Sequence, residues 1–114
     1  MCFKIIFKFS LVIMLLLQLT SIAQASWQEG LVQELRVLSK EWVVFYLDGN
    51  LRTDIPACAK NTYWVLNPAT EAGKKMFSVL MGAKFAKAKV RVEGANDCVV
   101  SPRDGETVDV LRLL

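Results

Sequence analysis

The chain of 114 residues contains three cysteines, whose thiols have the most distinctive chemistry in the sequence. A thiol can pair with a second thiol, attack a substrate or bind a metal ion. Cys58 and Cys98 lie far from Cys2, and no histidine is present to complete a metal site with them. We predict a structural disulfide between Cys58 and Cys98 and no metal site. The alternatives are a reactive thiol or a metal ligand.

Aromatic side chains are the second group that could bind a ligand, because rings pack against sugar faces and nucleobases. Trp42, Val44 and Tyr46 alternate along one apolar run and should share a face. We predict Trp42, Tyr46 and Tyr63 as candidate ligand-binding residues. The alternative is a second buried face, or part of a contact between subunits.

Residues suited to catalysis are scattered. Without histidine, the chain lacks the commonest general base, and Ser78 has no evident partner. The sequence has no phosphate-binding loop and no dinucleotide fingerprint. Several carboxylates fall in or near turns, where local hydrogen bonding is their usual role: Asp48, Asp54, Asp97, Asp104 and Glu106. We predict that the protein is not an enzyme and needs no cofactor.

The N-terminal 25 residues have the composition of a signal peptide. Lys4 and Lys8 precede an apolar run, and Ala23-Gln24-Ala25 provides small residues for cleavage. A membrane anchor is the alternative, but the run is shorter than the about 20 residues that a span needs. We therefore predict a cleaved segment 1–25, a secreted or periplasmic protein, and no stable membrane anchor.

Residues 26–114 are then a single small domain. Loss of the two lysines reduces the formal charge from +3 to +1, which argues against nucleic acid as a partner. An even number of cysteines in an exported chain favours a disulfide. A bond across about 40 residues stabilises a fold by roughly 4 kcal/mol, a large share for a small domain.

Alternating patterns predict five strands and one helix. Leu31 to Leu38 and Trp42 to Leu47 form the first two strands, with Val43, Phe45 and Leu47 facing the core, and Asp48-Gly49-Asn50 should form a turn. The remaining strands are Asn61 to Leu66, Lys87 to Gly94 and Glu106 to Leu114.

The helix lies between the third and fourth strands. Asn67 is the predicted N-cap and Pro68 the first helical residue. The core-facing stripe of the helix consists of Ala72, Met76, Val79, Leu80 and Ala83. Phe77, Met81 and Phe85 form a second apolar stripe, which we predict to meet another subunit. The alternative is a broad core face.

The element order β-β-β-α-β-β predicts a mainly β fold with one helix, a five-stranded Greek-key barrel of the OB type. A barrel also leaves no exposed strand edges. The alternative is an open antiparallel sheet with one helix packed across it.

The chain resembles small exported proteins related to the subtilase cytotoxin B subunit. The resemblance rests on the signal peptide, Cys58 ahead of Tyr63-Trp64, the helix ending near Gly82-Ala83-Lys84, the strand Lys89-Val90-Arg91-Val92, and Cys98. It implies an OB-type barrel, often pentameric, with a glycan-binding role in the toxin members. No residue of this chain matches a sugar-binding motif of those members.

Together these features predict a non-catalytic, exported binding module that recognises surface glycans as a ring of identical subunits. The alternative is a monomeric periplasmic or secreted accessory or inhibitor protein that binds another protein.

Overall fold

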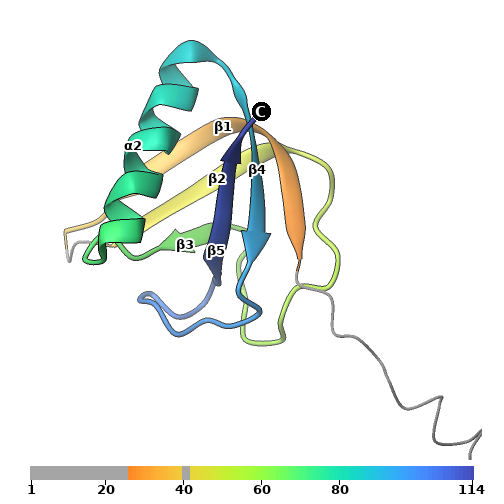
Figure 1. Ribbon diagram of the computed structural model, residues 1–114. Coiled ribbons are helices and arrows are strands. Elements are labelled where there is room, and N and C mark those ends of the chain that lie inside the picture. The colour runs from red at the N-terminus through yellow and green to blue at the C-terminus, as the bar shows by residue number, and fades with distance from the viewer. Residues whose placement is uncertain (1–25, 40–41) are drawn as a thin grey trace, which may run out of the picture.

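A computed structural model describes residues 26–39 and 42–114, and the predicted signal segment 1–25 lies outside them. Five strands form a closed barrel in the order β1-β2-β3-β5-β4. The helix α2 lies against the barrel, and its backbone comes close to β1, β3, β4 and β5 (Figure 1). The elements are β1 (Trp27–Val37), β2 (Val43–Gly49), β3 (Trp64–Leu66), α2 (Glu71–Ala86), β4 (Lys89–Gly94) and β5 (Glu106–Leu113).

The barrel closes through two pairings between strands distant in sequence. β1 pairs antiparallel with β2 on one side and with β4 on the other, and β3 pairs parallel with β5. A mainly β fold with one helix, the predicted order of elements and the Cys58–Cys98 disulfide are therefore confirmed. The open-sheet alternative is wrong, because the strands close on themselves. Membership of the OB class stays a prediction.

Two register shifts explain where simple alternation fails. The pairing of β1 with β2 shifts between Val32 and Glu34, so Val32 is buried and the next inward residue is Leu35. The pairing of β4 with β5 shifts between Val108 and Val110, and beyond this shift Leu111 packs against the core. An extra residue in a strand reverses which face later side chains occupy, and it bends the strand, as a small barrel requires.

The main core fills the barrel between the strands and α2. The predicted inward set of β2, Val43, Phe45 and Leu47, is buried there. The β2 strand runs two residues further than predicted, through Asp48 and Gly49, because both pair with β1. Trp64 is fully buried, and its indole Nε1 donates a hydrogen bond to Gln28 Oε1 at 3.0 Å.

The helix begins later than predicted. Thr70 is the N-cap, and its Oγ1 accepts a hydrogen bond from the Gly73 N–H at 2.9 Å. Asn67 instead accepts from the Ala69 N–H in the turn before it. A Cβ on Gly73 would lie 1.6 Å from the Asn67 carbonyl oxygen, so the turn packs directly on the first helical residues. This packing leaves Ala72 exposed, contrary to the predicted core stripe.

Candidate functional site

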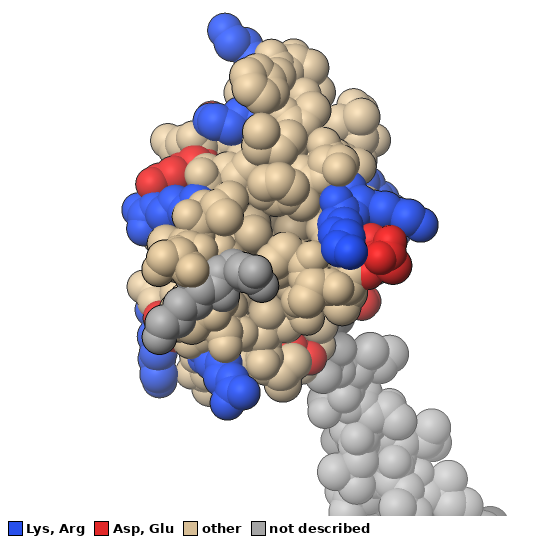
Figure 2. Space-filling model, turned by 90° about the vertical axis from the view of Figure 1, so that its left-hand side faces the viewer, with Lys and Arg blue, Asp and Glu red and all other residues tan. Residues whose placement is uncertain are grey.

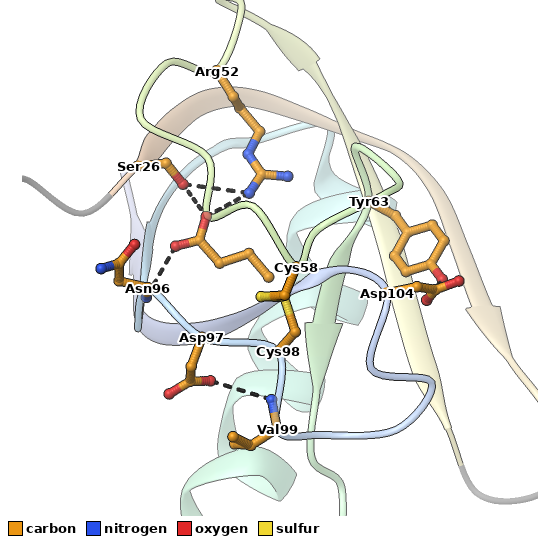
Figure 3. Close-up of a disulfide and its surroundings, with 10 residues drawn as sticks. Ser26, Arg52, Cys58, Tyr63, Asn96, Asp97, Cys98, Val99 and Asp104 are labelled. Carbon is orange, nitrogen blue, oxygen red and sulfur yellow. Dashed lines mark hydrogen bonds and ion pairs between the residues drawn. A yellow bond between two sulfur atoms is a disulfide. The ribbon is translucent and has the colours of Figure 1, made fainter.

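The Cys58–Cys98 disulfide joins two loops at one end of the barrel. Its Cα atoms are 6.1 Å apart. One loop connects β2 to β3, and the other connects β4 to β5 (Figure 3). These loops carry polar side chains on both sides of the disulfide. The disulfide thus holds these two loops together.

A buried ionic cluster lies on one side of the disulfide. Arg52 Nη2 contacts Glu106 Oε1 at 2.6 Å, with their side chains 2% and 0% exposed. Ser26 Oγ donates to the same carboxylate oxygen, and the Asn96 N–H donates to Oε2 at 3.1 Å. The Arg52 guanidinium lies 3.6 Å from the centroid of the Trp64 ring. Burial lowers the pKa of Arg52, against the opposing effect of Glu106.

This cluster corrects the prediction that Glu106 serves only local hydrogen bonding. Glu106 is the first residue of β5, and the parity of that strand places it inward with Val108. A Cβ on Gly94 would lie 1.9 Å from Glu106 Oε2, so only glycine leaves room for the carboxylate. The alternation from Glu106 to Val108 was the signal in the sequence for this inward glutamate. We assign the cluster a structural role, because all its charged groups are enclosed.

A tyrosine cluster lies on the other side of the disulfide, formed by Tyr46, Tyr63, Asn61 and Asp104. The two rings meet edge to face with centroids 5.8 Å apart. Tyr63 donates its hydroxyl proton to Asp104 Oδ1, and Asn61 Nδ2 donates to Oδ2 at 2.9 Å. Burial first, and then Asp104, raise the pKa of Tyr63 to about 12. Asp104 was also predicted to bond only locally, but it contacts a side chain 41 residues away.

Trp42 lies in a groove beside the tyrosine cluster. The cavity volume is about 380 Å³, and we call it the Trp42 groove. Its lining is Trp42, Asn67, Pro68, Ala69, Val99, Val100 and Ser101. Val100 also packs against the buried cluster of Val44, Tyr63 and Val65. The groove is therefore formed by the residue before β2, the turn before α2 and the loop that follows Cys98.

The three predicted ligand residues differ from one another in position and exposure. Tyr46 and Tyr63 are in contact, but Tyr63 is only 8% exposed, so its ring offers little surface to a ligand. Tyr46 is half-buried and lies under the Arg36 guanidinium, 5.8 Å from the ring centroid. Trp42 lines the adjacent groove. Sequence reasoning missed the loop residues Val99 to Ser101, because no periodic pattern marks a loop.

The second apolar stripe of α2 divides between core and surface. Phe77 is partly buried and packs against the main core, whereas Phe85 is 82% exposed. Met81 lies between these extremes. The alternative of a broad core face thus applies to Phe77. Contact of Met81 and Phe85 with another subunit stays a prediction.

Grooves flank α2 on the side of β1. One, of about 480 Å³, is lined by Val37, Val43, Pro68, Ala69, Lys74 and Phe77. Another, of about 500 Å³, is lined by Leu35, Met81, Lys84, Phe85 and Lys87. Both are mainly apolar, with lysines as their charged members. The lining residues of these two grooves include no carboxylate, cysteine or serine.

Within residues 26–39 and 42–114, no group of three or more His, Cys, Asp or Glu side chains is arranged to hold a metal ion. No described helix is both long and apolar enough to cross a bilayer.

Comparisons with known proteins leave the family assignment as a hypothesis. No protein-family model, no curated protein and no solved structure matches this chain. The resemblance to the subtilase cytotoxin B subunit therefore rests on the residues quoted above.

Proposed function

We propose that the mature protein is an exported, non-catalytic module that binds carbohydrate in the Trp42 groove. The observation that carries the proposal is the groove itself, which Trp42 lines together with polar residues of two separate segments, Asn67 and Ser101. A sugar presents an apolar face for an aromatic ring and hydroxyls for amide and hydroxyl partners. Trp42 supplies the ring, and Asn67 and Ser101 supply polar groups.

The position of the groove agrees with this proposal. Barrels of the OB class bind oligosaccharides on the face of the second and third strands and on neighbouring loops. Trp42 immediately precedes β2, and Asn67 immediately follows β3. Val99 to Ser101 belong to the loop between β4 and β5. Glycan recognition is also what the resemblance to the toxin B subunit implies.

A glycan array with the oxidised mature protein tests this function. We expect selective binding that Trp42→Ala removes and Tyr46→Ala weakens. Trp27→Ala is the matched control, because Trp27 is an exposed aromatic on β1, stacked on Arg91 and outside the groove. Absence of any signal for the unaltered protein, or equal loss with the Trp27 variant, would contradict the proposal.

We propose further that identical subunits assemble into a ring, as the resemblance implies. Exposed apolar side chains at several points of the barrel support self-association, among them Val37, Val99 and Leu113. Light scattering at micromolar concentration should then report a stable oligomer. A monomer under these conditions would exclude the ring while leaving the carbohydrate site open to its own test.

A second candidate function is a monomeric accessory or inhibitor protein that binds another exported protein. The two apolar grooves beside α2 favour it, since grooves of this kind accept apolar side chains of a partner. A pull-down from the native compartment distinguishes the candidates: a stoichiometric protein partner with a monomeric bait supports this function rather than glycan recognition.

A further inference from the structure

Positive charge in the folded domain is concentrated in one segment of the chain. Residues 71–89, which comprise α2 and the start of β4, contain five lysines and one glutamate, a net charge of +4. The rest of residues 26–114 contains seven basic and ten acidic residues, a net charge of −3. The domain is almost neutral in total, yet it has a strong charge asymmetry. Such a distribution orients a protein in an external field.

The positive charge around α2 is poorly neutralised by the protein itself. Four arginines elsewhere each form an ion pair with a carboxylate: Arg36, Arg52, Arg91 and Arg112. In contrast, Lys75, Lys87 and Lys89 are exposed and form no ion pair with another described residue. Lys84 donates to the Gln33 carbonyl oxygen at 3.1 Å and forms no ion pair with another described residue. This charge is therefore available to an anionic partner.

An exposed aromatic side chain lies among these lysines. Phe85 is 82% exposed near the C-terminal end of α2, between Lys84 and Lys87. Together with Met81 and Leu35, these residues line the groove of about 500 Å³. We call Met81, Lys84, Phe85, Lys87 and Lys89 the basic tip. On the face that carries α2, Lys and Arg side chains lie around a largely uncharged middle, with some Asp and Glu side chains beside them at the two sides (Figure 2).

We propose that the basic tip docks on the surface of a bilayer rich in anionic lipid. Phe85 and Met81 enter the boundary between headgroups and acyl chains, and the lysines lie at the level of the phosphates. An apolar patch flanked by lysines binds such surfaces through buried area and electrostatic attraction together. The net charge of −3 on the rest of the domain turns the basic tip toward the membrane and the remaining surface away from it.

Charge complementarity favours a bilayer as the occupant. Long exposed lysines around one aromatic ring suit a fluid array of phosphates, which adapts to them without a fixed arrangement of partners. The Trp42 groove lies at the other end of α2, beside the turn before its N-cap, so the basic tip does not overlap it. Membrane docking is thus compatible with ligand binding in that groove and does not depend on it.

Co-sedimentation of the oxidised mature protein with vesicles tests this proposal. We expect binding to vesicles of phosphatidylglycerol and phosphatidylcholine, little binding to phosphatidylcholine alone, and weaker binding as salt is raised toward about 1 M. Lys87→Glu with Lys89→Glu should lower the partition coefficient at least about tenfold. Phe85→Ser should lower it several-fold.

Matched controls separate the basic tip from general charge and hydrophobicity. Leu51→Ser removes an apolar side chain that is 91% exposed but lies in the loop between β2 and β3. Lys60→Glu with Arg103→Glu reverses two exposed charges away from α2. Both control proteins should bind like the unaltered protein.

Three results would overturn the proposal. They are no binding to anionic vesicles, equal binding to neutral vesicles, or equal loss with the control variants. Light scattering without vesicles tests whether a second copy of the chain, rather than a bilayer, covers the basic tip. If Phe85→Ser dissociates an oligomer and vesicle binding is unchanged, the basic tip is a contact between copies of the chain.

Discussion

The buried cluster around Glu106 gives a prediction with a magnitude. Glu106→Gln keeps the shape of the side chain and removes its charge, which leaves the Arg52 guanidinium enclosed without a counter-ion. Loss of one partner from a buried ion pair costs about 3–5 kcal/mol. Contact with the Trp64 ring stabilises the cation by only about 2 kcal/mol, a contact already present in the unaltered protein. It therefore cannot offset the loss.

A loss of this size is a large fraction of the about 5–15 kcal/mol that stabilises a domain. Urea unfolding of the oxidised mature protein, followed by tryptophan fluorescence, measures it. The companion variant Arg52→Met removes the cation, and the double variant removes the pair. Because each single change leaves one charged group buried alone, the double variant should be more stable than the sum of the single losses predicts, by about 2 kcal/mol.

Two results would refute this reasoning. A loss below about 1 kcal/mol for Glu106→Gln would mean that solvent reaches the guanidinium, contrary to its 2% exposure. Additive losses in the double variant would mean that the two groups do not interact in solution. Glu34→Gln is the control, because its ion pair with Arg36 is half-exposed and its removal should leave the urea midpoint unchanged.

Three further predictions test the cluster of tyrosines, the disulfide and the core. The chain has two tyrosines, so Tyr46→Phe leaves Tyr63 alone, and its absorbance should titrate near pH 12 in the folded protein rather than near 10. Since folding raises this pKa, the Tyr63 contribution to stability is complete below about pH 10 and is lost as the pH rises through 12. Unfolding midpoints that do not fall across this range would contradict the raised pKa of Tyr63. Reduction of the disulfide should lower the free energy of unfolding by about 4 kcal/mol, and an unchanged urea midpoint would show that the reduced chain is equally constrained. Phe45→Ala should cost about 3–5 kcal/mol because its side chain is fully buried, whereas Phe85→Ala should leave the thermal midpoint nearly unchanged; similar losses would contradict the assigned burial.

Periodicity predicted the elements well and their local detail less well. The inward set of β2, Val43, Phe45 and Leu47, follows from alternation and is confirmed. Alternation could not locate the two register shifts, because a bulge depends on the partner strand. Both Asn67 and Thr70 are residue types that cap helices, and local sequence does not decide that Thr70 is the one that caps α2.

The candidate site was less predictable than the fold, because loops supply most of it. The aromatic residues Trp42 and Tyr46 were found from the pattern of β2, but the other side of the Trp42 groove comes from the loop after Cys98. The partners of Glu106 and Asp104 come from parts of the chain that only the closed barrel brings near them, such as Ser26 and Tyr63. Sequence patterns relate residues that are close along the chain, so they cannot identify pairs of residues that are distant in sequence.

The disulfide connects stability to the candidate site through one short segment. Cys98 is bonded to Cys58, and the next three residues, Val99 to Ser101, form one wall of the Trp42 groove. On the other side of Cys98, Asn96 donates to Glu106 and Asp97 accepts from the Thr107 N–H at 2.9 Å. The segment is thus fixed at several points close to the groove. A groove with one wall held in this way requires little ordering to bind a ligand, and a low ordering cost raises the affinity that the proposed carbohydrate site can reach.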